Sequence, residues 1–321
     1  MYKNRLEVVL LNGFLSNLQT VAVQVVILYL ISAVGFVADK SKIFVKADAT
    51  KLVDLLFNMI LPVAIINSFL SMERTKEHIV GLIVSFVLAF LTHFLGMGIA
   101  EFCFKKRSLL ERGIYSYAMV FSNAAFLALP LAQSVAGEEG VFYSSCYVAV
   151  FNILAFTYGI REISGRKAKI SIKHIFLNPG SISVLIAIPL FLLQVRLPEF
   201  LMDTVARVGA CNSPMAMIVF GTFFANCNFK NIFAKKEVYF VSLIRLVVIP
   251  VIMLFVFKLI GVKGNMLTAL TISASAPVAT NTAMYAAKYD NDTALSSELV
   301  GQTSILSVIT MPVIVALAQI I

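Results

Sequence analysis

Residues 122–140, with the sequence SNAAFLALPLAQSVAGEEG, lie inside a long apolar segment yet carry several polar side chains. These are Ser122, Asn123 and Gln133, and a proline stands at position 130. A proline inside a helix removes a backbone donor, and its ring clashes with the preceding turn, so we predict a break or kink near Pro130. In a bilayer, freed backbone groups are tolerated only where protein or a water-filled cavity satisfies them. The stretch therefore predicts a broken helix beside a cavity.

A second stretch, residues 273–292 (SASAPVATNTAMYAAKYDND), has the same character. Here Pro277 stands close to Thr280, Asn281 and Thr282. Interrupted hydrophobic segments at corresponding places in two halves of a chain are typical of transporter binding sites. The two stretches together predict a secondary carrier whose substrate binds where two broken helices meet.

The composition places the chain among helical membrane proteins. Hydrophobic residues make up 60% of the 321 and charged residues only 13%, whereas a soluble domain is roughly half apolar and a quarter charged. The net charge of +9 comes from short loops between apolar runs, so positive-inside topology explains it better than nucleic-acid binding. Four cysteines have no metal-ligand spacing: Cys103, Cys146, Cys211 and Cys227. We therefore expect no metal, no cofactor and no nucleic-acid partner.

Apolar runs of spanning length predict ten transmembrane helices, since a helical span needs about 20 residues. The predicted spans are 14–38, 50–70, 79–104, 112–136, 139–160, 180–195, 200–226, 237–260, 265–288 and 294–320. Loops after the odd-numbered spans carry 17 basic residues and those on the opposite side 7. This asymmetry predicts that the odd loops are cytoplasmic and that both termini lie outside. The basic residues Lys3 and Arg5 at the N-terminus point the other way.

The spacing of prolines suggests an internal repeat. Pro62 and Pro214 are 152 residues apart, and Pro130 and Pro277 are 147 apart, both close to half the chain. Five spans in each half force the second half to be inverted relative to the first. We predict a first five-helix repeat over residues 1–164, a cytoplasmic linker over 165–179 and the inverted second repeat over 180–321.

Amide side chains near the two predicted breaks are candidate substrate ligands. The amide of Asn123 can donate to a carboxylate or offer its oxygen to a cation. A lone asparagine in a membrane helix more often makes an interhelical hydrogen bond. The repetition of amide and proline near Asn281 favours the binding role. Asn152, Thr280 and Thr282 are further candidates as ligands or as neighbours of ligands.

Ionisable residues inside predicted spans are candidates for proton or ion coupling. Glu298 and Gln302 are four apart, so they share a helix face and can line the cavity, although Glu298 can equally lie at the interface. Arg245 can meet an anionic substrate, but we favour a structural ion pair. His93 can relay protons, but a packed, hydrogen-bonded histidine is the more common case.

Helix ends also bear on the substrate. A broken helix points the N-terminus of its second half, with free N–H groups and a positive dipole, toward the break. Two such ends suit an anion without a buried arginine. We therefore expect a small organic anion, a mono- or dicarboxylate, as the substrate.

At these stretches the sequence resembles the auxin efflux carrier family, which includes plant auxin exporters and bacterial malate or malonate carriers. The first half carries SN-x6-P at Ser122, Asn123 and Pro130, the GEEG turn, and Asn152. The second half carries SAPVATN over residues 275–281 and AAKYDND over 286–292. The segment LFNMILPVAIINS, residues 56–68, also resembles the family's second helix.

This resemblance implies ten helices as two inverted five-helix repeats, with the fourth and ninth helices crossing at Pro130 and Pro277. It implies elevator-type motion of a transport domain against a scaffold, and often a homodimer. Asn123 matches the family's crossover asparagine. The short central loop suits a bacterial inner-membrane carrier. Plant exporters have no asparagine at the position of Asn281, so their substrate is not carried over, and coupling to H⁺ or Na⁺ stays open.

Two other function classes compete with the carrier. A membrane receptor or regulatory protein would bind a small ligand without translocating it, and binding without uptake would distinguish it. An intramembrane aspartyl protease needs a GxGD partner for a YD pair, and Tyr289–Asp290 has none. The absence of HExxH and Walker A motifs also argues against a zinc protease and an ATP-driven pump.

Overall fold

The computed structural model describes residues 2–168, 178–227 and 232–320. In this part of the chain nearly all residues are helical, and the only extended pairing is an isolated bridge between Ser122 and Val278. In the first half the elements are α1 (Tyr2–Lys40), α2 (Lys46–Leu55), η1 (Leu56–Ile60), α3 (Leu61–Leu70), α4 (Lys76–Phe104), α5 (Leu109–Val120), η2 (Ala124–Ala128), α6 (Leu129–Leu154), η3 (Ala155–Gly159) and α7 (Ile160–Ile163). The second half has α9 (Pro179–Leu192), α10 (Glu199–Ala210), α11 (Asn212–Ala225), α12 (Lys236–Leu243), η4 (Ile244–Val248), α13 (Ile249–Leu259), α14 (Gly264–Ser275), α15 (Asn281–Lys288) and α16 (Thr293–Ile320).

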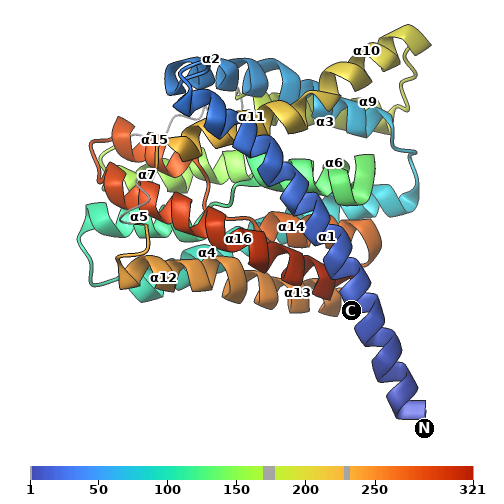
Figure 1. The fold of residues 1–321 in the computed structure, drawn as a ribbon. Coiled ribbons are helices and arrows are strands. Elements are labelled where there is room, and N and C mark those ends of the chain that lie inside the picture. Colours follow the sequence, from blue (N-terminus) through green and yellow to red (C-terminus); the bar gives the residue numbers. More distant parts are fainter. Residues whose placement is uncertain (1, 169–177, 228–231, 321) are drawn as a thin grey trace.

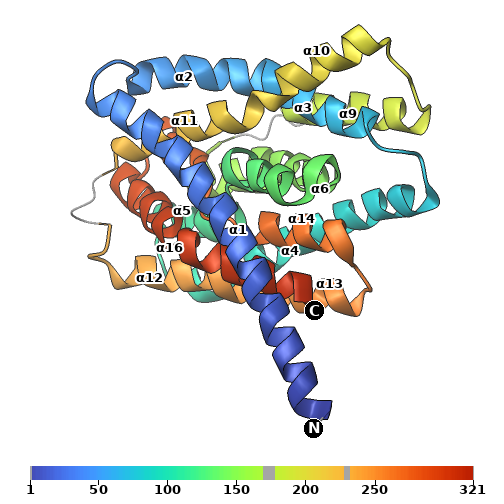
Figure 2. The same ribbon diagram turned by 45° about the vertical axis from the view of Figure 1, so that its right-hand side comes forward.

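The helices form two layers (Figure 2). One layer consists of α2, η1, α3, α9, α10 and α11, and the other consists of α4, α5, α12, α13, α14 and α16. Helix α6 lies between the two layers, and α1 runs obliquely across both of them (Figures 1 and 2). Helix α1 packs against α11 and α16, and its N-terminal turns project beyond the other helices (Figure 2). The two layers therefore meet along α6 and α1.

Seven described stretches are long and apolar enough to cross a membrane. They are Leu11–Lys40, Lys46–Leu70, Lys76–Phe104, Ala124–Ile163, Glu199–Ala225, Lys236–Leu259 and Thr293–Ile320. Three of the ten predicted spans are absent from this set. The spans predicted at 112–136 and 265–288 are interrupted, and the one predicted at 180–195 corresponds to α9, which has only 14 residues. The predicted linker 165–179 lies largely outside the described residues.

The 40-residue stretch Ala124–Ile163 contains a sharp turn. Gly137 has φ 60° and ψ −150°, a conformation that few residues other than glycine adopt. Three residues later, a Cβ at Gly140 would collide with the carbonyl oxygen of Ala132. Residues 132 and 140 would lie about 12 Å apart along a straight helix. The chain therefore folds back at Gly137, and the predicted GEEG turn separates two helical segments.

Prolines follow π-turns at three places in the chain. Pro62, Pro130 and Pro250 each stand two residues after the end of η1, η2 or η4. At each turn a backbone N–H reaches the carbonyl five residues earlier, as Leu129 does to Ala124. This wider turn makes room for a ring that would clash with the carbonyl four residues back in a regular α-helix.

Of the break or kink predicted near Pro130, the structure has a π-turn at that place and the break elsewhere. The helix is interrupted at residues 121–123, seven residues before the proline, while Pro130 itself lies in the first turn of α6. The π-turn η2 absorbs the proline without ending the helix.

Glycines allow α1 and α11 to pack with their backbones in contact. A Cβ at Gly35 of α1 would collide with the carbonyl of Ile218, and one at Gly221 of α11 would collide with the carbonyl of Ser32. Each helix thus contributes a glycine to the same crossing. Small residues at helix crossings are a common means of close association in membranes.

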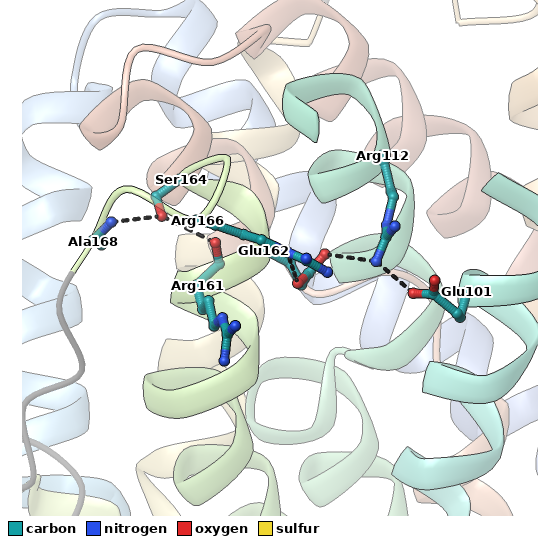
Figure 3. A network of polar contacts seen from close by, with 7 residues as sticks. All are labelled: Glu101, Arg112, Arg161, Glu162, Ser164, Arg166 and Ala168. Atoms are coloured by element: carbon teal, nitrogen blue, oxygen red, sulfur yellow. Dashed lines mark hydrogen bonds and ion pairs between the residues drawn. The ribbon is translucent and has the colours of Figure 1, made fainter. Parts of the chain in front are cut away.

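A network of charged side chains joins the ends of α4, α5 and α7 (Figure 3). Arg112, which is 8% exposed, pairs with Glu101 and lies 3.5 Å from Glu162. Glu162 is 4% exposed and also accepts from Arg166 at 3.0 Å. Because Glu162 is buried between two arginines, removal of either partner would leave an under-compensated charge. The network therefore holds these three helix ends together.

Asn291, in the turn between α15 and α16, ties a fourth element to this region. Its Nδ2 donates to the carbonyl of Leu110 at 2.9 Å and to that of Ile163 at 2.8 Å. The first-half helices α5 and α7 are thus attached to the second-half turn that follows α15.

Candidate functional site

The two interrupted helices meet through their backbones. Residues 121–123 separate α5 from η2, and residues 276–280 separate α14 from α15. The N–H of Asn123 donates to the carbonyl of Pro277 at 2.7 Å, and that of Ala279 donates to Phe121 at 3.0 Å. These bonds surround the antiparallel bridge between Ser122 and Val278. Backbone groups of an unwound segment have no helical partner, and a bilayer offers them no water. Here each unwound segment supplies hydrogen-bond partners for the backbone groups of the other.

Helix α16 supports this pairing from one side. The N–H of Val278 donates to Oγ1 of Thr303 at 3.1 Å, and Thr303 is fully buried. Thr303 also donates to the carbonyl of Leu299 at 2.7 Å within its own helix. The unwound segment of the second half is therefore fixed to a continuous helix.

A cavity of about 340 Å³ opens beside the paired segments. Of the eight residues predicted to bind substrate, five line it and three do not. Ser122, Asn123, Asn152, Thr280 and Asn281 line the cavity. Pro130, Pro277 and Thr282 lie outside its lining, and Thr282 is buried with its hydroxyl donating to Ala279 at 2.6 Å.

Polar atoms at the cavity are left without hydrogen-bond partners among the described residues. Nδ2 of Asn123, which is 3% exposed, has none, and neither has the hydroxyl of Ser122 or Oδ1 of Asn281. The hydroxyl of Tyr117 lies close to the side chain of Asn281, but the two groups are not aligned for a hydrogen bond. Buried polar groups in native proteins are nearly always paired, so unpaired groups that border a cavity are available to bind a ligand or water.

Aromatic rings form much of the cavity wall. The lining rings are Phe57, Phe126, Phe151, Phe156 and Tyr285. Tyr117 packs behind them, with its ring centroid 4.4 Å from Phe121 and 5.8 Å from Tyr285. The sequence pattern does not single out these residues. With 26 phenylalanines in the chain, no local signal distinguishes the few that face the cavity.

The N-terminus of α9 forms another wall. Asn178 caps this helix by accepting from the N–H of Ser181 at 2.9 Å, and Gly180 lies in the lining. The amide of Asn152 lies against Gly180 so closely that a Cβ there would collide with its Nδ2. This glycine therefore keeps space for the Asn152 amide at the cavity. The helix end adds a positive dipole to the same wall.

One charged side chain lines the cavity among the described residues, and it is acidic. Asp54 is exposed at the junction of α2 and η1, where Asn58 donates to its backbone carbonyl at 2.6 Å. The cavity thus combines amide groups and two helix N-termini with apolar rings and a single carboxylate.

His93 and Arg245 lie outside this cavity lining. His93 is fully buried, with Nδ1 2.7 Å from the carbonyl of Ala89 and its ring centroid 4.8 Å from Tyr147. Arg245 is 1% exposed and lies next to the hydroxyl of Tyr147. Among the described residues no acidic side chain pairs with Arg245, so the structural ion pair expected for it is not found there. Its neighbours in the folded protein come from other helices, which sequence spacing does not reveal.

Glu298 and Gln302 likewise lie away from the cavity. Glu298 is 4% exposed and forms an ion pair with Lys235 at 2.8 Å. Gln302 is fully buried and accepts from the hydroxyl of Ser242 at 2.8 Å. Both therefore join α16 to the segment that contains α12, and neither belongs to the described cavity lining.

Comparison with known proteins agrees with these features. The family model described as membrane transport protein, the domain of the auxin efflux carriers, matches residues 20–315. Among curated proteins, none matches the chain. Since the match covers nearly the whole chain, this protein belongs to the membrane transport protein family of the auxin efflux carriers, and it is an integral membrane transporter, not an enzyme.

Proposed function

We propose that this transporter is a secondary carrier or uniporter that moves a small organic anion, a mono- or dicarboxylate, across a bacterial inner membrane. The observation that carries the proposal is the buried amide of Asn123, unpartnered at a cavity where Asn281 of the other half also ends. An amide N–H and helix N-termini are suitable partners for a carboxylate. The N-termini of α15 and α9 both border this cavity.

The proposal includes ten crossings in two inverted repeats. The α5–η2–α6 segment up to Gly137 is the fourth crossing, and α14 with α15 is the ninth. With α9 as the sixth crossing, the other seven are the long apolar stretches, of which Ala124–Ile163 supplies the fifth crossing only with its part after Gly137. Both termini lie outside, and alternating access occurs by elevator motion. The layer of α2, α3, α9, α10 and α11 with α1 acts as the scaffold, in a homodimer, with H⁺ or Na⁺ as the possible coupling ion and no cofactor.

The test is uptake into proteoliposomes of labelled lactate, malonate, malate and indole-acetate, with and without pH and sodium gradients. We expect saturable uptake of at least one acid above that of empty liposomes. Calorimetric titration of the same acids into purified protein separates the alternatives. Binding without uptake would overturn the carrier and favour a receptor or regulatory protein.

A further prediction concerns the charge of the substrate. The carboxylate of Asp54 repels a dianion more than a monoanion, by about 1 kcal/mol at a hydrated site. Asp54→Asn should therefore lower the KM of a dicarboxylate about fivefold relative to that of a monocarboxylate. The control is Glu199→Gln, an exposed acid on α10 that lines no described cavity. An unchanged KM ratio in Asp54→Asn would exclude this role.

A further inference from the structure

A second cavity, of about 480 Å³, lies on the other side of α15. It shares Thr280 and Met284 with the first cavity, so the first turn of α15 separates the two spaces. The other lining residues come from the start of α2, from α11 and the two residues after it, from α15, and from α16. They are Lys46, Phe220, Phe223, Phe224, Asn226, Cys227, Ala283, Ala287, Thr293, Ser297 and Val300.

The charge in this second cavity is opposite to that in the first. Lys46 is its only charged lining residue in the described part of the chain, and it is exposed. Its ammonium group forms no ion pair with any described residue. Asp54, the charged residue of the first cavity, lies eight residues further along the same α2–η1 segment. An anion is therefore attracted to the second cavity more strongly than to the mouth of the first.

The remaining lining is apolar enough to accept an organic body. Three phenylalanines of α11, Phe220, Phe223 and Phe224, face the cavity together with Lys46. An ammonium group beside aromatic surface matches a carboxylate attached to an apolar group. Inorganic anions would gain only the charge interaction.

We propose that the second cavity is a binding site for the same organic anion, with Lys46 as its cationic contact. We call it the outer site because the anion occupies it before it reaches the first cavity, whichever side of the membrane it faces. The anion passes Thr280 and Met284 to reach the amides of the first cavity. This inference rests on the proposed function, because it requires an anionic substrate. Lys46 follows the loop between α1 and α2, so the outer site serves the face on which that loop lies.

The neighbouring lysine gives a matched control. Lys51 lies on the same helix, is also exposed and lines neither cavity. Both substitutions, Lys46→Gln and Lys51→Gln, remove one charge from α2. General electrostatic attraction would be weakened equally by both, whereas an outer site depends on Lys46 alone.

The experiment measures the transported acid in proteoliposomes of uniform orientation, with substrate added to either face. For Lys46→Gln we expect KM to rise about fivefold on the face of the α1–α2 loop, as loss of about 1 kcal/mol requires. The maximal rate and the KM on the opposite face should not change. Lys46→Arg should restore the wild-type KM, and Lys51→Gln should resemble wild type.

The outer site is overturned if Lys46→Gln and Lys51→Gln have the same KM, or if KM rises equally on both faces. If the wild-type protein carries none of the acids, the proposed function fails instead. In that case calorimetric titration with indole-acetate decides on the site by itself. Two binding events in the wild type and one in Lys46→Gln would support it, and equal isotherms would exclude it.

Discussion

Uptake by the Asn123→Ala carrier should require roughly tenfold to a hundredfold more substrate than uptake by the wild type. A hydrogen bond to a charged group contributes about 1.5–3 kcal/mol, and each 1.4 kcal/mol corresponds to tenfold in affinity. The Asn123 side chain is 3% exposed and its Nδ2 has no partner among the described residues, so no internal bond is lost with it. Because the backbone of Asn123 makes the bond to Pro277, alanine keeps the pairing of the two segments. The measurement is KM in proteoliposomes, alongside the melting temperature of the purified protein.

Asn58→Ala is the control for this variant. Asn58 also lines the cavity, but its amide already donates to the carbonyl of Asp54 at 2.6 Å. One of the two amide hydrogens of Asn58 is already used within its own helix, so its substitution should change KM by less than about threefold. Equal effects of the two substitutions would show that the carboxylate is not held by Asn123.

The Gly221→Ala protein should be severely destabilised. The added Cβ would collide with the carbonyl of Ser32, and neither backbone can move without separating α1 from α11. Overpacking of this kind costs typically about 1–3 kcal/mol, and more where a backbone carbonyl is the obstacle. Gly35→Ala should behave in the same way, because its Cβ would meet the carbonyl of Ile218 in the same crossing. The measurement is the melting temperature in detergent, together with the yield of monodisperse protein.

Gly98→Ala provides the comparison. Gly98 lies within α4, and a Cβ there would meet nothing within 4 Å. Alanine is also the better helix former, by about 1 kcal/mol. Gly98→Ala should therefore melt at or slightly above the wild-type temperature. A Gly221→Ala protein as stable as Gly98→Ala would mean that α1 and α11 do not pack as described.

The sequence pattern predicts the residues that meet at the cavity more accurately than the position at which the first helix is interrupted. Asn123 and Asn281 lie in one cavity, and the repeated amide and proline were enough to single them out. Their role in binding stays a prediction. The helix breaks at residues 121–123 and not at Pro130, because a π-turn accommodates the proline ring. Residues 124–128 carry no sequence signal that predicts a π-turn.

Features that depend on the packing of distant helices were not predictable from the sequence. The aromatic rings that face the cavity cannot be told from the many that face lipid, since both kinds occur in apolar helices. Gly180, in the first turn of α9, leaves space for the amide of Asn152, which is 28 residues earlier in the sequence. That no described acidic residue pairs with Arg245 likewise depends on neighbours that local spacing does not give.

The backbone bonds between residues 121–123 and 276–280 have a consequence for the thermodynamics of transport. Because Asn123 and Asn281 belong to segments joined by these bonds, any motion that exposes the cavity to the other face carries both amides together. The hydrogen bonds from these two amides to the ligand are then the same whether the cavity opens to one face of the membrane or to the other. Apart from the contribution proposed for Lys46, a difference in affinity between the two faces must come from the opposing wall, formed by residues such as Val53, Phe57 and Gly180. Substitutions in that wall should make the two dissociation constants unequal, whereas substitutions of the amides should scale both by the same factor.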